Sequence, residues 1–148
     1  MGPRNAIVLG SWFMNREMEL ATLRACLVTV RPTELPTVTM ELPASKSELA
    51  ALGVARTHAC TCSGGAAQAD CPAHAAWDKH LLLQKLFPTS FGSEGPVVSL
   101  PFFPNRFGKP VWKKGMVETI LFAAQTGWPE SPATLSDPPV PRDFPGWG

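Results

Sequence analysis

A cluster of cysteine and histidine residues is the feature that most restricts how this chain can fold. Cys60-x-Cys62 is followed by a Ser/Gly/Ala-rich stretch and then by Cys71 and His74, so the two pairs can meet only if the chain turns back on itself. Zinc prefers four such ligands in a tetrahedron, and two adjacent glycines give the intervening loop the freedom to surround an ion. We therefore predict a zinc ion bound by Cys60, Cys62, Cys71 and His74. Its role is structural, because four protein ligands leave no position for a water molecule to be activated.

Other interpretations of this cluster stay open at the level of sequence. His58 lies close enough to compete as a ligand, and the alternative to zinc is three reduced thiols with no metal between them. A metal hydrolase that uses His58 or His80 would need an open coordination position, which four protein ligands do not leave. Cys26 lies far from the cluster in the sequence, and we expect it to fill the core.

The composition is that of one packed domain without a broad charged surface. Hydrophobic residues make up 45% of the 148-residue chain and charged residues 17%, which excludes wholesale disorder and allows a single core. The net charge is only +1, so any contact with DNA would rest on local groups such as Lys113 and Lys114.

The apolar segments are too short to direct the chain to a membrane. No run approaches the roughly 20 residues of a membrane span, and the apolar stretch near the N-terminus is too short for a secretory signal. We expect no membrane partner and a nuclear or cytoplasmic location. Reducing conditions there favour metal binding by cysteine over disulfides.

Apolar periodicity predicts a chain of mixed helices and strands. Helical spacing indicates helices over 11–24, 74–87 and 113–125. Two β-branched stretches, 27–30 and 37–42, predict strands that are close enough for an antiparallel hairpin.

The remaining segments carry weaker signals. Residues 97–100 form one apolar, strand-like piece in a loop-rich region, and the proline-rich residues 128–148 have no periodic pattern and predict an unstructured tail.

Three segments occur in an order that resembles the catalytic domain of tyrosine recombinases, the phage-integrase family. Residues 10–24 contain Arg16-x-x-Glu19 on a predicted helix, residues 42–47 place Lys46 after a hairpin strand, and residues 100–110 precede a helix. The resemblance covers roughly residues 8–127. The Cys/His insert, residues 56–75, is similar to inserts in divergent recombinase-like proteins of mobile elements.

The resemblance implies an α+β fold and three functional residues. The fold would be a partial, mainly helical catalytic domain with a small antiparallel β-hairpin sheet and a zinc-knuckle-like insert. Arg16 would hold the scissile phosphate, Lys46 would protonate the departing hydroxyl, and Glu19 would orient Arg16. Fixed positive charge of this kind stabilises a phosphoryl-transfer transition state. Arg16 and Lys46 would have to converge on one phosphate-sized pocket.

Several elements of the recombinase pattern are missing. The chain contains no tyrosine to act as nucleophile, and His80 is followed three residues later by Leu83 rather than by arginine. The resemblance therefore implies a C-terminally truncated, incomplete recombinase or integrase domain that is inactive alone, uses no small-molecule cofactor and retains residual DNA binding. The alternative is a small zinc-stabilised interaction module, in which Arg16 and Glu19 form an ordinary ion pair on a helix. No feature of the sequence specifies an oligomeric state.

Overall fold

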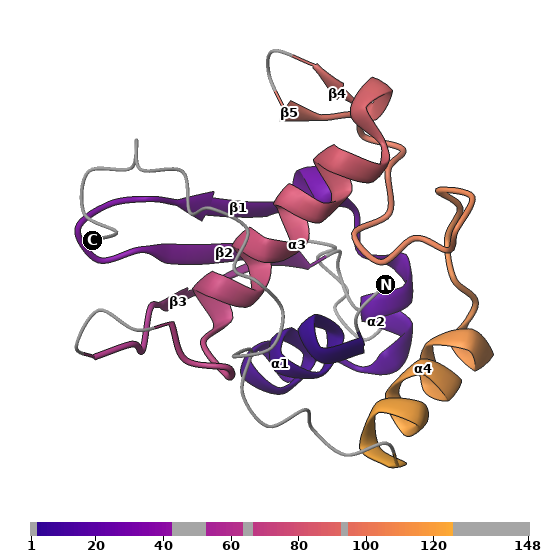
Figure 1. Cartoon of the computed structure of the whole chain (residues 1–148), viewed down its shortest axis with the longest axis horizontal. Coiled ribbons are helices and arrows are strands. Elements are labelled where there is room, and N and C mark those ends of the chain that lie inside the picture. The colour runs from indigo at the N-terminus through magenta and orange to yellow at the C-terminus, as the bar shows by residue number, and fades with distance from the viewer. Residues whose placement is uncertain (1–2, 43–52, 64–66, 93–94, 126–148) are drawn as a thin grey trace.

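A three-stranded antiparallel sheet with the strand order β1-β2-β3 organises the molecule (Figure 1). The structure is a computed structural model that describes residues 3–42, 53–63, 67–92 and 95–125. The strands of this sheet are β1 (Val28–Arg31), β2 (Thr37–Leu42) and β3 (Val54–Ala59). The predicted hairpin between the first two strands is confirmed, with Val30 opposite Val38. The third strand was not predicted.

Four α-helices and a second, two-stranded sheet complete the described part of the chain. The helices are α1 (Pro3–Phe13), α2 (Glu17–Thr22), α3 (Pro72–Leu86) and α4 (Lys113–Gln125). The small sheet pairs β4 (Phe91–Gly92) with β5 (Gly95–Pro96), and two 3-10 turns are η1 (Ala25–Leu27) and η2 (Pro88–Ser90). The chain is thus a mixture of helices and a small antiparallel sheet, and α3 and α4 lie where the periodicity placed them. No helix among these is long and apolar enough to cross a membrane.

The large sheet buries one face and exposes the other. Val28, Val38 and Met40 are buried on the face that α3 crosses (Figure 1). On the opposite face Thr39 lies between its strand neighbours Thr29 and Thr57. The Thr39 and Thr57 hydroxyls are hydrogen-bonded at 2.8 Å. This alternation follows from the two-residue period of a strand.

The helices pack against one another beside the sheet. α1 contacts α3 and α4, and α2 contacts α4. Leu9 and Phe13 of α1 are fully buried, and so is Leu20 of α2. An ion pair of 3.0 Å between Lys113 and Glu17 joins α4 to α2 and lowers the pKa of the Glu17 carboxyl through the hydrogen bond from Lys113.

The prediction of one continuous helix over 11–24 is wrong, because the chain breaks between α1 and α2. Met14 has a left-handed backbone with φ 52°. The N–H of Asn15 donates to the carbonyl of Gly10 at 2.9 Å, and the N–H of Met14 donates to Ser11 at 3.3 Å. These two bonds form a Schellman motif, which ends a helix and usually has glycine at the left-handed position. Methionine there gives no sequence signal for the break.

The expected strand over 97–100 is not formed either. This segment instead leads into a stretch that docks on the end of α2. The N–H of Ala25 donates to Leu100 at 2.9 Å, and the N–H of Phe102 donates to Leu23 at 2.8 Å. Phe102 is fully buried as a result. The predicted tail, residues 128–148, lies outside the described residues.

Candidate metal centre

The first two ligand candidates follow the end of β3. Side chains two apart in a strand share a face, so Arg56, His58 and Cys60 all point toward the covered side of the sheet. The N–H of Cys60 donates to the carbonyl of Pro36 at 2.7 Å, which holds the chain beside β2 after the ladder ends. Cys62 is two residues further along and is also partly buried.

The other two candidates come from the start of α3. Cys71 is the N-cap residue and Pro72 follows it at the first helical position, where a missing N–H costs nothing. His74 is three residues after Cys71, so the two side chains lie on the same side of the first turn. Cys71 is fully buried.

The four side chains meet in one compact group. Their ligand atoms, the three cysteine sulfurs and a histidine nitrogen, all lie within 4.8 Å of one another. The Nδ1 atom of His74 is 3.2 Å from the Cys71 sulfur, 3.3 Å from the Cys62 sulfur and 3.8 Å from the Cys60 sulfur. The Cys60 and Cys71 sulfurs are 3.6 Å apart, and none of these cysteines forms a disulfide.

These distances are close to the edges of a metal-centred tetrahedron. Bonds of about 2.3 Å to sulfur and 2.0–2.1 Å to nitrogen give edges of about 3.8 Å between sulfurs and 3.5 Å between sulfur and nitrogen. The observed separations of 3.2–3.8 Å lie around those values. The predicted ligands therefore lie together and could hold a metal ion.

The thiols of the group differ in how easily they ionise. Burial opposes ionisation of Cys71, but hydrogen bonds from the backbone N–H and ring of His74 lower its pKa to about 6. Burial raises the pKa of Cys62 to about 12, and its thiol neighbours add to the rise although the N–H of Gln68 opposes it. A bound divalent cation would favour the thiolate form of all three cysteines, because it stabilises every thiolate that coordinates it.

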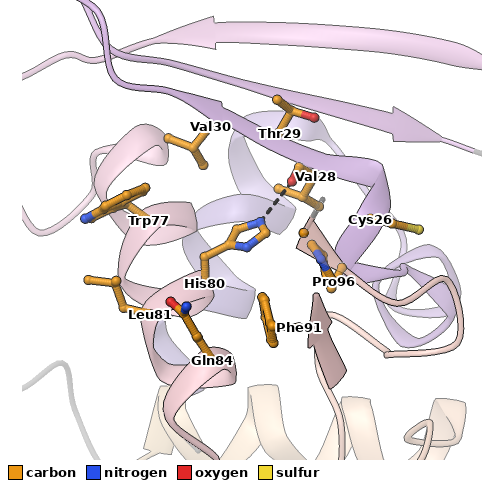
Figure 2. A pocket seen from close by; sticks show the side chains of 12 residues that line it. Cys26, Val28, Thr29, Val30, Trp77, His80, Leu81, Gln84, Phe91 and Pro96 are labelled. Carbon is orange, nitrogen blue, oxygen red and sulfur yellow. Dashed lines mark hydrogen bonds between the residues drawn. The ribbon is translucent and has the colours of Figure 1, made fainter. Parts of the chain in front are cut away.

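The competing histidines lie elsewhere. The His58 ring makes edge-to-face contacts with Trp12 and Phe13, at centroid distances of 5.5 and 4.7 Å. His80 donates from Nε2 to the carbonyl of Val28 at 2.9 Å and lines a cavity of about 390 Å³ between β1, α3 and the β4–β5 hairpin (Figure 2). Burial lowers the pKa of His80. Neither His58 nor His80 joins the ligand group, so a metal hydrolase built on them has no support among the described residues.

The residues implied by the recombinase resemblance are only partly described. Arg16 is exposed and is the N-cap residue of α2. The Glu19 carboxylate accepts the backbone N–H of Arg16 at 2.8 Å, which satisfies one free donor at the start of the helix. Among the ion pairs of the described residues, none joins the Arg16 and Glu19 side chains, although their spacing allows one. Lys46 lies outside the described residues.

Residues that contact the ligand group, or the segment just before Cys71, were missed by sequence reasoning. The N–H of Gln68 donates to the Cys62 sulfur at 3.1 Å. Arg4 and Trp12 of α1 donate to the carbonyls of Ala69 and Asp70, immediately before Cys71. The contacts of Arg4 and Trp12 span 65 and 58 positions of the sequence, so no local pattern could have indicated them.

Comparison with known proteins does not assign the chain to a family. No model of a protein family matches it, and searches of curated proteins and of solved structures found no match either.

Proposed function

We propose that Cys60, Cys62, Cys71 and His74 bind one zinc ion and that this ion stabilises the fold. The observation that carries the proposal is the meeting of their four ligand atoms within 4.8 Å. Three sulfurs and one imidazole nitrogen suit zinc better than magnesium or calcium, which prefer oxygen ligands. The ion would join the end of β3 to the start of α3.

The role follows from the ligand count. A catalytic zinc ion keeps one position open for water, whereas four protein ligands close the tetrahedron. The chain is accordingly a zinc-stabilised module, with the centre serving as a cross-link rather than as a reactive site.

Metal analysis of the purified full-length chain tests the proposal. We expect one zinc ion per chain, and cobalt substitution should give the absorption spectrum of tetrahedral thiolate coordination. A chain that is folded and carries no zinc after purification with added metal would disprove the centre. An octahedral cobalt spectrum would disprove the ligand set.

As a second candidate, we propose that the module contacts the DNA backbone in the manner of a recombinase domain. The supporting observation is where the α1–α2 junction lies. Asn15 donates to the Met40 sulfur at 2.9 Å, and Arg56 donates to the carbonyl of Phe13 at 2.7 Å. Met40 and Arg56 are paired near the end of the β2–β3 ladder.

The position of that junction is relevant to Arg16 and Lys46. Arg16 directly follows Asn15, and the connection that carries Lys46 leaves β2 two residues after Met40. The Arg16 side chain is exposed, and no ion-pair partner is present for it among the described residues. Arg16 is thus next in sequence to a residue that contacts β2 near its C-terminal end, and Lys46 lies four residues after that end in the sequence. This arrangement supports a shared phosphate contact.

Anisotropy titrations of labelled duplex DNA at several salt concentrations test the second candidate. We expect Arg16→Ala and Lys46→Ala each to weaken binding and to reduce the slope of log K against log salt by about 0.9, the value for one lost phosphate contact. The matched control is Arg31→Ala. Arg31 is an exposed arginine that pairs with Thr37 at the start of β2, away from the end where Met40 lies. Equal effects at positions 16 and 31 would rule out a specific site.

A further inference from the structure

Two side chains of α1 hold the segment that leads into the metal centre. The Arg4 guanidinium donates twice to the carbonyl of Ala69, at 3.1 and 2.8 Å. The Trp12 indole N–H donates to the carbonyl of Asp70 at 2.7 Å. These two carbonyls are the last ones before the ligand Cys71, so the two bonds restrict how Cys71 enters the ligand group.

The anchored segment touches the ligands on both sides of the intervening loop. The N–H of Gln68 donates to the Cys62 sulfur at 3.1 Å, and the Gln68 carbonyl accepts the N–H of Cys71 at 3.2 Å. Residues 67–70 therefore connect one ligand from each pair, since Gln68 is hydrogen-bonded to both Cys62 and Cys71. A segment in this position orients ligands without binding the ion itself.

The C-terminal end of α1 also contacts β3, just before Cys60 and Cys62. The rings of Trp12 and Phe13 pack on His58, which lies two residues before Cys60 on the same face of the strand. Arg56, two residues before His58 on β3, donates to the carbonyl of Phe13 at 2.7 Å. One helix thus contacts the chain next to both halves of the ligand set.

We propose that Arg4 and Trp12 are positioning residues of the metal centre and that metal binding and the docking of α1 are thermodynamically linked. The proposal rests on the zinc centre proposed above. Side chains that orient metal ligands without coordinating the ion typically change metal affinity by 10- to 100-fold. Linkage is reciprocal, so an ion that binds more tightly when α1 is docked must also stabilise the docked α1.

Competition with a chromogenic chelator measures the zinc affinity of the full-length chain and its variants. Trp12→Phe keeps an aromatic ring beside His58 and removes the N–H donor to Asp70 together with one ring of the indole, and we expect it to weaken zinc binding about tenfold. The matched control is Trp112→Phe, because Trp112 is 87% exposed. Arg4→Ala should weaken binding by a similar factor, and Arg4→Lys should restore part of the affinity by keeping one donor.

The cobalt spectrum of each variant separates positioning from loss of the site. We expect the tetrahedral spectrum to be unchanged in Trp12→Phe although the affinity is lower. Wild-type affinity in both Trp12→Phe and Arg4→Ala would overturn the inference and leave the zinc centre standing. A wild-type chain that binds neither zinc nor cobalt would overturn the zinc centre and this inference together. If Arg4→Ala does not fold, the conservative Trp12→Phe variant decides the question.

Discussion

The candidate metal centre and the α1–α2 junction are both places where one element ends and another begins, yet only the first could be predicted from the sequence. The ligands of the centre are of types that coordinate metals, and they lie near one another in the chain. The junction depends on Met14 adopting a left-handed conformation, for which methionine has no preference. Chemical identity therefore predicts the first site, whereas backbone geometry decides the second.

The sharpest test of this comparison removes the metal centre. Cys71→Ser deletes a fully buried ligand. In the presence of free zinc at about a thousand times its dissociation constant, we expect the variant to lose about 4 kcal/mol of unfolding free energy. Denaturant titrations with and without a chelator measure the change, and chelator should no longer affect the variant.

A second cysteine provides the control for that experiment. Cys26 is partly buried, lines the cavity beside His80 and takes no part in the ligand group. Cys26→Ser should therefore keep its dependence on zinc. If chelator destabilises neither wild type nor Cys26→Ser, the ligand group does not stabilise the fold through a bound metal.

The junction predicts a gain in stability from a substitution that would ordinarily weaken a helix. Met14 is 77% exposed and has φ 52°, so Met14→Gly removes the left-handed strain and loses little packing. We expect the unfolding free energy to rise by about 1 kcal/mol. Met18→Gly, inside α2, should lower it by about 1 kcal/mol. A loss of stability at both positions in thermal or denaturant unfolding would mean that one helix continues through Met14.

The smallest expected effect is a change of stability with pH, which tests whether His80 is a buried neutral residue outside the ligand group. Burial lowers the pKa of His80 in the folded chain, so the unfolded chain takes up a proton first as the pH falls through about 6.5. The contribution of neutral His80 to stability is therefore present above this range and is lost as the pH falls toward the folded pKa.

A glutamine at this position isolates that contribution. His80→Gln can still donate to the Val28 carbonyl but does not titrate, so its stability relative to wild type should increase as the pH is lowered from 7.5 to about 5.5. Denaturant unfolding of both proteins at each pH measures the difference, and effects of acid on the metal centre cancel. A difference that does not vary with pH would contradict a buried, neutral His80.

The fold was predictable where local signals are strong. β2 and α4 lie where alternation and helical spacing placed them, and Pro72 and Pro88 enclose α3. β3 was missed because its sequence, Val54–Ala59, contains few strongly apolar residues and gains its regularity from pairing with β2. The contact of α1 with the segment before Cys71 was missed for a related reason, since Arg4 and Ala69 are 65 positions apart.

The short separation between Cys60 and His74 also has a consequence for how the chain folds. Contacts between residues close in sequence need little loop-closure entropy, and chains rich in such contacts fold quickly. We therefore expect β3 and the first turn of α3 to associate early when metal is present. The long-range contacts of α1 would follow, and zinc would then raise the folding rate as well as the final stability.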